Sequence, residues 1–538
     1  MEAPATGTRS PSRFARLARA ALTVSAGNAV GRLLGLAREQ TIAALFGRSA
    51  ATDAFTAASR VPVTTYDLLV GGMISAAFVP VLAAEAEQSE RSFWQLAGQL
   101  LTIFTLLLAL VSVLVVLLAD PLVSLLTPAF APATRALTLT LLQIMAPSLF
   151  FLGLSGVAIG ILQARRHFGA PAFGAALFNL AFIVAAWLLR ERGVEALAIG
   201  LVAGSAAQLA LQLLALRGAP LRPLLSLRNP ALRRIGQLYL PVLLGLVVSS
   251  AGVLIDTNLA SRLPAGDLTA MRYATTLTQF TLGLVATAIG AAYLPELARL
   301  APHSPAYRAA LGEALRAVLT LIVPAALALV ILREPVLRLL FQRGEFGSAD
   351  TARTALAFLT YAPGIPAAAL DQILIYAFYA RQDTLRPVSV GVLAVGVYLL
   401  TALILIDPFG MVGLALANSA QWTSHLLMMA VLTWLVVRPL PWRSLVLPLA
   451  RVTCAVLPAS AIWWLSLPLL PTPALLLLPA LLVVGVVGAA VYLATLWLLR
   501  APEVIALWQR FPPPADTIAG SFLIGGGAEG RLPACPAV

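Results

Sequence analysis

The chain has 538 residues, of which 60% are hydrophobic and only 11% are charged, and its mean hydropathy is +0.91. This composition excludes a soluble protein of the same size and indicates a membrane protein. The net charge of +13 invites a nucleic-acid partner, but the arginines fall mainly in segments that would be cytoplasmic if the amino terminus is. We therefore expect no nucleic-acid partner, and both termini in the cytoplasm.

Apolar runs of about 20 residues recur from end to end, and each is long enough to cross a hydrocarbon core of roughly 30 Å. They predict an all-α polytopic membrane protein with about fourteen transmembrane helices. The expected ranges are 18–46, 52–86, 92–118, 133–163, 171–190, 194–216, 234–262, 267–298, 307–332, 351–380, 387–406, 410–436, 446–469 and 474–499.

The first predicted helix carries a stripe of small residues. Gly27, Gly31 and Gly35 follow one another at four-residue spacing, which places them on one face. Such a stripe lets a neighbouring membrane helix approach closely.

Charged residues interrupt the same helix. Arg32 and Arg38 would bind a phosphorylated or carboxylated headgroup, because a guanidinium grips two oxygens at once. Alternatively, Arg38 pairs with Glu39 or Asp53, and Arg32 extends to the membrane surface or caps a helix end. Ionised groups at bilayer depth are costly unless they face water or a partner, so these residues predict a hydrated interior.

The second predicted helix has Asp53, Arg60 and Asp67 at seven-residue spacing, with Pro62 as a possible bend. An acid, a base and an acid on one face of an apolar helix again indicate a polar cavity, typical of a transporter. Asp53 and Arg60 could instead satisfy one another along the stripe.

Two further acids, Asp256 and Asp371, lie inside apolar segments. With Glu39 and Asp67 they are candidates for gating or for coupling to a proton or cation, and a buried interhelical pair explains them equally well.

We find no signature of catalysis. The three histidines have no metal-ligand spacing, and no nucleotide-binding or nucleophile motif occurs. Cys454 and Cys535 are too few and too badly placed for a disulfide framework. We expect no enzyme activity, no catalytic residue, no cofactor and no metal, so that an ion gradient, the membrane potential or downhill flow drives any transport.

The chain also contains a duplicated half. Three short segments recur in register roughly 215 residues later, which predicts two parallel six-helix repeats. The matching segments are Ala77–Ala83 with Ala292–Ala298, Gln163–His167 with Tyr379–Asp383, and Ser205–Gln208 with Asn418–Gln421.

This repeat divides the chain into predicted domains. A basic cytoplasmic segment, 1–17, precedes an N-lobe, 18–217, and a C-lobe, 218–438. The helices of 439–500 fall outside the repeat, and the tail, 501–538, is expected to be cytoplasmic and mostly disordered.

Six short motifs of the chain are distinctive: Gly31–Glu39, Leu45–Gly47, Thr52–Phe55, Ala77–Pro80, Phe341–Phe346 and Phe378–Thr384. They resemble motifs of the MurJ/MviN lipid II flippases of the multidrug/oligosaccharidyl-lipid/polysaccharide exporter superfamily. The resemblance implies fourteen helices, with two six-helix lobes around a cationic cavity and two further helices that form a groove for a lipid tail.

The resemblance also implies roles for individual residues. Arg32, Arg38 and Asp53 match functional positions of the first two helices, and Glu39 stands where the family usually has aspartate. We expect Arg32 and Arg38 to bind a diphosphate, and Asp53 and Arg60 to gate or orient them by pairing.

This sequence departs from the family pattern at two places. Tyr66 and Asp67 occupy the place of a usual arginine pair, and Thr276 replaces an arginine that follows Tyr273 and Ala274. Fewer cations are therefore expected in the cavity. The sequence does not identify which saccharide the carrier lipid bears.

Together, the resemblance implies a flippase in the bacterial cytoplasmic membrane. It would move a polyprenyl-diphosphate-linked saccharide across the membrane by alternating access. This substrate would be lipid II or a related precursor of peptidoglycan or polysaccharide, and the surrounding membrane lipids would be its other partners. A monovalent cation or the membrane potential would drive it. The alternatives are an organic-cation antiporter of the same superfamily and a membrane scaffold that transports nothing.

Overall fold

The computed structural model describes residues 13–226, 228–302, 304–437 and 443–502. Most of the predicted amino-terminal segment 1–17 and nearly all of the predicted tail 501–538 lie outside these residues. Within them the chain is helical and contains no strand, which confirms the all-α prediction.

The helices follow one another as α1 (Arg13–Phe46), α2 (Ala50–Tyr66), η1 (Asp67–Gly71), η2 (Ile74–Phe78), α3 (Val79–Gln88), α4 (Glu90–Leu117), α5 (Ala119–Leu126), α6 (Pro132–Ala164), α7 (Gly169–Leu188), η3 (Arg190–Arg192), α8 (Glu195–Ala215), α9 (Pro230–Ala260), α10 (Asp267–Arg299), α11 (Pro305–Ile331), α12 (Arg333–Phe341), α13 (Ser348–Tyr361), α14 (Gly364–Tyr379), α15 (Leu385–Phe409), α16 (Met411–Val437), α17 (Arg443–Ser466), η4 (Leu467–Leu469) and α18 (Ala474–Leu498).

Each predicted range coincides with one of these helices or with a broken one. Twelve described helices are long and apolar enough to cross a membrane, and the bent pair α13–α14 makes thirteen. That pair bends by 47° at Ala362–Pro363, because proline disrupts the hydrogen-bond ladder of a helix. Helix α1, with 34 residues and the charges noted above, corresponds to the remaining predicted range but is not among the helices that pass this test.

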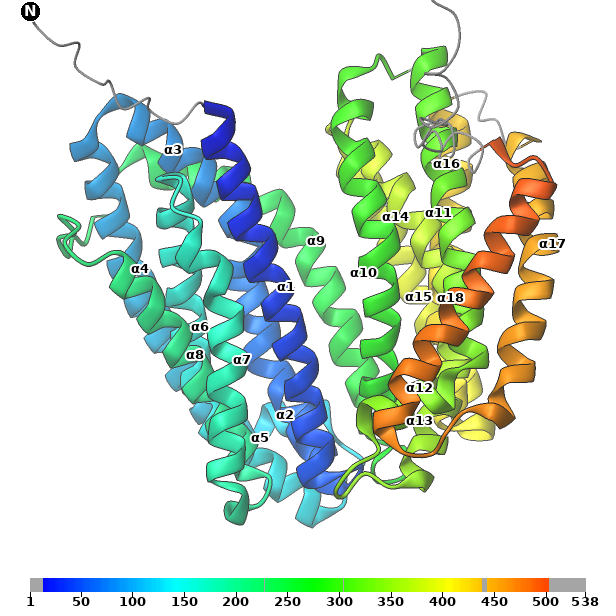
Figure 1. Cartoon of the computed structure of the whole chain (residues 1–538). Helices are drawn as coiled ribbons and strands as arrows, with labels where there is room; N and C mark the ends of the chain where they lie inside the picture. The colour runs from blue at the N-terminus through cyan, green and yellow to red at the C-terminus, as the bar shows by residue number, and fades with distance from the viewer. Residues whose placement is uncertain (1–12, 227, 303, 438–442, 503–538) are drawn as a thin grey trace, which may run out of the picture.

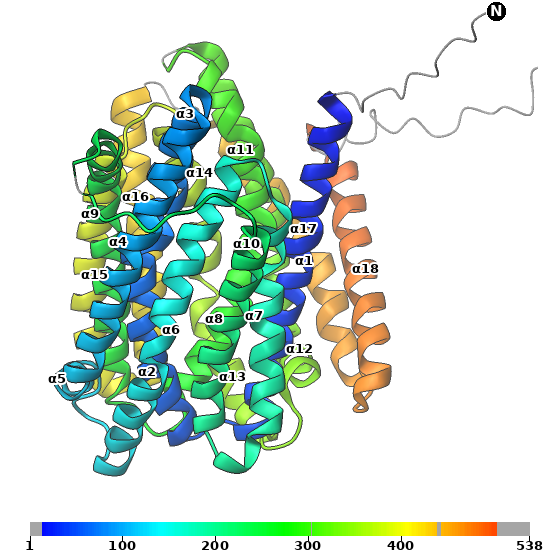
Figure 2. The same ribbon diagram turned by 90° about the vertical axis from the view of Figure 1, so that its left-hand side faces the viewer.

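The helices form two lobes. Figure 1 shows α1–α8 as one lobe and α10–α16 as the other; the lobes meet where α1 ends and separate toward the side where α1 begins. Helices α17 and α18 stand at one edge of the bundle (Figure 2) and pack against α11 and α12 through Leu332, Trp463 and Tyr492. The two lobes and the two additional helices confirm the predicted architecture, whereas the domain boundaries stay a prediction.

Helix α9 crosses from one lobe to the other. Its first residues, such as Ile235 and Tyr239, pack in the N-lobe core beside Val70. Its last residues, Leu259 and Ala260, belong to the C-lobe core. In Figure 1 it runs diagonally behind α1 and α10, so the two lobes stay connected on that side of the molecule.

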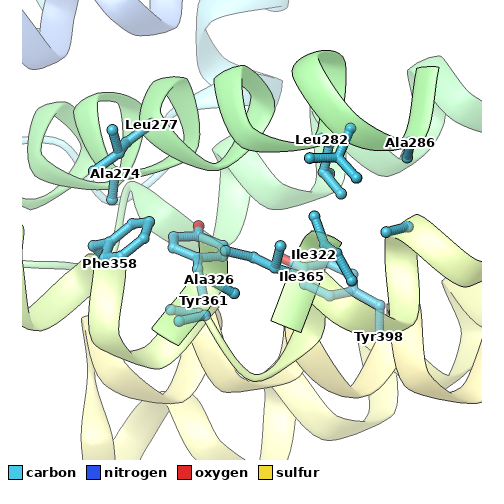
Figure 3. Close-up of a cluster of buried hydrophobic side chains, with 14 of the residues drawn as sticks. Ala274, Leu277, Leu282, Ala286, Ile322, Ala326, Phe358, Tyr361, Ile365 and Tyr398 are labelled. Carbon is cyan, nitrogen blue, oxygen red and sulfur yellow. The ribbon is translucent and has the colours of Figure 1, made fainter. Parts of the chain in front are cut away.

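The core of the C-lobe forms along α10. Figure 3 shows Ala274, Leu277 and Leu282 of α10 facing Ile322 of α11 and Phe358 of α13. These buried apolar side chains fix the position of α10, whose other face borders the space between the lobes.

The glycine stripe of α1 has the predicted packing role. A Cβ at Gly27 would lie 2.6 Å from the carbonyl oxygen of Ala172 on α7, and a Cβ at Gly31 would touch that of Ala175 at 3.4 Å. The side chain of Asn179 on α7 donates to the carbonyl of Gly31 at 3.2 Å. Helix α1 is thereby held against α7 as part of the N-lobe.

The second span departs from regular α-helix after Tyr66. Two π-helical turns, η1 and η2, occupy Asp67–Gly71 and Ile74–Phe78. A π-turn leaves backbone carbonyls without a regular partner, and the hydroxyl of Tyr239 on α9 donates to the carbonyl of Leu68. The start of α9 is therefore tied to the N-lobe by a hydrogen bond as well as by packing.

The lobes repeat each other's irregularities. Helices α6 and α14 both end in a residue with positive φ, Arg166 and Gln382, each with φ of 60°. Helices α4 and α11 both break at a leucine of nearly equal backbone angles, Leu118 and Leu332, before a short helix. These pairs lie at the spacing of the sequence repeat, which supports the duplicated half.

Candidate functional site: a cationic cavity between the lobes

A cavity of about 1050 Å³ lies between the lobes, bordered by α1 and α2 on one side and by α10, α11 and α12 on the other. Its charged lining consists of one glutamate, Glu39, and the guanidinium cluster, Arg32, Arg38, Arg60 and Arg272. Threonines and apolar side chains make up most of the rest. The cavity is therefore an anion-attracting space at membrane depth, as Arg32, Arg38 and Arg60 predicted.

Glu39 joins the two lobes at the centre of this cavity. Its Oε1 accepts from Nη2 of Arg38 at 2.9 Å and from Nη2 of Arg272, on the opposite lobe, at 2.8 Å. The residue is only 5% exposed, and its Oε2 has no hydrogen-bond partner. One carboxylate thus neutralises part of the charge of two guanidiniums, one from each lobe.

Aromatic rings hold these guanidiniums in place. Arg38 lies over the rings of Phe178 and Phe182, at 5.7 and 5.6 Å from their centroids, and Arg272 lies 5.5 Å from the centroid of Phe55. Cation–π contacts of this kind restrict the side chains without consuming their hydrogen-bond donors. The Nε of Arg38 is buried without a hydrogen-bond partner.

Arg60 occupies a second position in the cavity, next to Asp256. The two side chains interact electrostatically across the lobes, and the hydroxyl of Tyr398 donates to Asp256 at 2.5 Å. The Nε of Arg60 is buried without a hydrogen-bond partner. Asp256 is thus the acid that attracts Arg60 most strongly, and the expected pairing of Arg60 with Asp53 is wrong, because the Asp53 carboxylate binds Gly266 and Thr269.

Asp53 instead caps the first turn of α10. Its carboxylate accepts from the backbone N–H of Gly266 at 2.5 Å and of Thr269 at 2.8 Å, and from the hydroxyl of Thr269 at 2.6 Å. It is 3% exposed and does not border the cavity. A carboxylate at a helix amino terminus satisfies free N–H groups and complements the helix dipole. Here the cap comes from the opposite lobe.

A charged network surrounds Asp53 at the end where the lobes meet. Asp267, fully buried, accepts a bidentate pair from Arg353, with Nε at 2.9 Å and Nη2 at 2.6 Å. Arg48 of the N-lobe lies 3.4 Å from Asp267 and donates to Asp350 at 3.0 Å. We name Arg48, Asp53, Asp267, Asp350 and Arg353 the inter-lobe latch.

Local sequence places Arg48 in the latch. Gly47 has φ of 60°, which reverses the chain after α1, and Ser49 caps α2 by accepting from the backbone of Thr52 at 3.3 Å. The turn also brings the loop of the C-lobe close, since the N–H of Glu345 donates to the carbonyl of Ala44 at 3.0 Å.

Comparison with known proteins now decides the family. The profile of the family "Lipid II flippase MurJ" matches residues 42–483. The chain belongs to the lipid II flippase MurJ family. "Lipid II flippase MurJ" of Burkholderia cenocepacia is 34% identical over 418 residues, covering 74% of this chain and 80% of the relative. "Probable lipid II flippase MurJ" of Rhizobium meliloti is 31% identical over 493 residues, covering 87% and 91%.

Solved structures agree on the fold. A structure described as "Lipid II flippase MurJ, inward closed conformation" matches with a TM-score of 0.76 at 20% identity over 91% of this chain and 99% of that one. An inward-facing multidrug resistance MATE transporter of the MOP superfamily matches with 0.64 at 14% identity over 76% and 95%. The chain is thus a multi-pass protein of the bacterial inner membrane with the MurJ fold.

One cavity cation escaped the sequence analysis. Arg272 lies one helical turn before Thr276, whose hydroxyl donates back to the carbonyl of Arg272 at 2.9 Å, and both line the cavity. Residues four apart share a helix face, so α10 keeps a guanidinium in spite of Thr276. Thr276 lines the cavity without a charge, as the sequence indicated, and Arg272 supplies a guanidinium that the sequence analysis had not considered. The signal was a lone arginine in an apolar helix.

The sequence analysis also did not predict the latch, although the distribution of arginines gave an indication of it. Arg333, Arg338, Arg343 and Arg353 broke the expected excess of arginine on the cytoplasmic side. One of them, Arg353, pairs with Asp267 in the latch, whereas Arg333 and Arg343 donate to backbone carbonyls of Val330 and Leu339.

The remaining candidates lie at three different places. Arg32 lines the cavity and is exposed, and Asp67 is exposed at the start of η1. Asp371 is buried inside the C-lobe, where its Oδ1 lies 2.8 Å from Nδ1 of His425. Among the described residues no three His, Cys, Asp or Glu side chains come together as metal ligands.

Proposed function

We propose that this chain translocates lipid II, or a closely related polyprenyl-diphosphate saccharide, and binds its diphosphate with the guanidinium cluster. The observation that carries the proposal is the cavity itself, in which Arg32, Arg38 and Arg60 of one lobe face Arg272 of the other. A diphosphate offers several anionic oxygens, and guanidiniums bind such oxygens two at a time.

The carboxylate of Glu39 occupies the position on the guanidiniums that the substrate's diphosphate would take. It occupies one donor each of Arg38 and Arg272, which are the donors that a diphosphate oxygen would take. An entering diphosphate brings more negative charge than one carboxylate and so replaces it on the guanidiniums. The volume of about 1050 Å³ is at the upper end of the roughly 300–1,000 Å³ of common ligand sites, so a saccharide headgroup fits.

The lipid tail needs a lateral exit from the cavity. Leu33 and Val63 of the N-lobe, and Phe280 and Leu284 of the C-lobe, line the cavity with exposed apolar side chains. These residues lie on α1, α2 and α10, opposite the crossing helix α9, and we place the portal between α1 and α10. Helices α11 and α12 border the cavity and also support α17 and α18, which supports the lipid-tail groove implied by the family.

Alternating access requires the latch to open. In this structure the lobes are joined at the latch and separate toward the side of the two described chain ends (Figure 1). With cytoplasmic termini, this is a state that loads its substrate from the cytoplasm. Release to the outside then needs the latch to break and the lobes to close at the other end.

The inside-negative membrane potential contributes to the drive. Moving one negative charge outward gains about 2.3 kcal/mol per 100 mV. A diphosphate carries its own charge, so part of the drive requires no coupled ion. The chain's side chains bind, orient and release; no bond is made or broken.

Native mass spectrometry of the purified full chain tests the proposal. We expect a polyprenyl diphosphate to co-purify with the wild type and to be lost from Arg38→Ala and from Arg272→Ala. The matched control is Arg135→Ala, which removes an exposed arginine paired with Asp120 away from the cavity. Retention of the lipid by both cavity variants would contradict the proposal.

The alternatives are not favoured by this cavity. An organic cation would meet four guanidiniums and a glutamate already paired with two of them. A scaffold without transport would not need ionised side chains around a cavity at membrane depth, where they are costly. Tighter binding of a cationic dye than of undecaprenyl diphosphate would reverse this preference.

A further inference from the structure

The C-lobe contains a buried ion pair that the cavity does not use. Asp371 in the middle of α14 and His425 in the middle of α16 approach to 2.8 Å between Oδ1 and Nδ1. Neither atom has another hydrogen-bond partner. The side chains keep only 12% and 14% of their surface accessible, and the two facing atoms themselves are buried.

The sequence repeat identifies the same place in the N-lobe. Asp371 precedes the segment Tyr379–Asp383 by eight residues, as Ser155 precedes Gln163–His167. His425 follows Gln421 by four residues, as Gln212 follows Gln208. The N-lobe counterparts of Asp371 and His425 are therefore Ser155 and Gln212.

The two places join equivalent helices through different chemistry and different partners, since Gln212 donates to the carbonyl of Ala170 at 3.2 Å and not to Ser155. In the N-lobe, Gln208 donates to the hydroxyl of Ser155 at 3.1 Å, and a Cβ at Gly174 would lie 2.8 Å from Nε2 of Gln212. In the C-lobe, a Cβ at Gly391 would lie 3.8 Å from Nε2 of His425. Both lobes thus join two helices beside a glycine of a third, with neutral groups in one lobe and ionisable groups in the other.

Stability does not explain this difference. A buried ion pair is usually no more stabilising than a neutral replacement of similar volume, because desolvation of the charges offsets their attraction. The N-lobe shows that serine and glutamine hold the equivalent helices together. The ionisable pair therefore has a role that a neutral pair cannot fill.

We propose that Asp371 and His425 form a proton-binding site that couples a proton to the movement of the lobes. With the proton the pair has no net charge; when the imidazolium releases it to water, a net charge of −1 is left in the lobe. A buried site favours the form of the pair that has no net charge. The role of the proton in transport rests on the proposed flippase function.

A connected set of contacts links this site to the latch. On α16, the hydroxyl of Ser419 donates to the carbonyls of Thr360 and Tyr361 at the end of α13, at 2.9 and 3.1 Å. Helix α13 begins near Arg353, which holds Asp267. A change in the contact between α14 and α16 therefore reaches the latch through α13.

Few other ionisable groups face the pair. Tyr379 of α14 interacts electrostatically with Asp371, and α15 presents Gly391. Toward α10 and α11, helix α14 shows neutral contacts: Gln372 donates to Thr287 at 3.3 Å, and Tyr307 donates to the carbonyl of Ala377 at 2.8 Å. The response to pH is accordingly assigned to Asp371 and His425 themselves.

The test measures lobe separation without any lipid substrate. Spin labels at Gln88→Cys and Ala298→Cys, both exposed where the lobes separate, report the distance between the lobes in the full chain in liposomes. Cys454→Ser and Cys535→Ser remove the native thiols. We expect the ratio of open to closed populations to change about tenfold between pH 5 and pH 8, as for a tenfold difference in proton affinity between the states.

Two variants and one control decide the outcome. Asp371→Ser with His425→Gln gives the C-lobe the neutral chemistry of the N-lobe, and Asp371→Asn is a milder change; both should lose the pH response. Ser155→Ala, at the equivalent N-lobe position, should keep it. A wild type without a pH response, or neutral variants that respond like the wild type, would overturn the inference. Lipid release from Arg38→Ala is independent of these labels, so failure of the flippase proposal is recognised separately.

Discussion

The two lobes share one architecture but differ in where they place charge. The N-lobe supplies Arg32, Arg38 and Arg60 to the cavity together with Glu39, whereas the C-lobe supplies Arg272 to the same lining. The C-lobe holds its acids away from the cavity lining, in Asp256 beside Tyr398 and Asp371 beside His425.

This difference indicates a division of labour in the duplicated half. The N-lobe supplies three of the four cavity guanidiniums and is suited to hold an anionic headgroup, whereas Asp256 and Asp371 of the C-lobe lie outside the cavity lining, beside a tyrosine and a histidine. The ion pair of Glu39 with Arg272 and the contacts of the latch connect the two lobes.

The largest effect is expected from a disulfide that prevents the two lobes from separating at the latch. The backbones of Ala44 and Glu345 lie within hydrogen-bond distance across the lobes, so a disulfide between Ala44→Cys and Glu345→Cys is geometrically reasonable. We expect oxidation to abolish lipid flipping in proteoliposomes and reduction to restore it. Each single-cysteine variant is the control, and full transport by the oxidised protein would show that this end need not open.

The next test removes one guanidinium from each lobe. A hydrogen bond to a charged group contributes about 1.5–3 kcal/mol, so Arg38→Ala and Arg272→Ala should each weaken binding of undecaprenyl diphosphate about ten- to a hundredfold. Because Arg272 ties the headgroup to the C-lobe, its loss should lower the flipping rate more than the loss of Arg38 does. Equal effects on rate would remove this distinction between the lobes.

A smaller effect is expected from Glu39→Gln. Without the carboxylate, Arg38 and Arg272 keep their full charge for the diphosphate, and binding should tighten by up to about tenfold. The flipping rate should fall, since the ionic contact between the lobes is lost. Binding affinity and single-turnover flipping measure the two effects. Weaker binding would show that Glu39 contacts the headgroup rather than competing with it.

The smallest effect compares one glycine of α1 with one glycine of α9. A Cβ at Gly27 would meet the backbone of Ala172 at 2.6 Å, whereas a Cβ at Gly245 would meet a methyl group of Val388 at 3.3 Å. A backbone cannot yield as a side chain can, so Gly27→Ala should destabilise the protein by about 1–3 kcal/mol. Gly245→Ala should change stability by less than about 1 kcal/mol, since alanine also favours the helix. Thermal unfolding in detergent checks both, and equal losses would contradict the difference in packing.

Local pattern was enough to predict the helices of this chain. The apolar runs located every span, because the thickness of the bilayer sets a length that can be counted along the sequence. The stripe of Gly27, Gly31 and Gly35 predicted a close helix contact, because residues four apart share a face whatever lies opposite. The three matched segments predicted two lobes of similar structure, because both copies of the repeat are present in the sequence and can be compared directly.

Only the tertiary structure decided which charges meet. Asp53 caps α10 and Glu39 bridges to Arg272, and both contacts join residues far apart in the sequence. Periodicity gives the direction of a side chain on its own helix, but it does not say which helix lies opposite or how the lobes are tilted. The partner of an ionised side chain in a membrane is set by that packing, and so is its role.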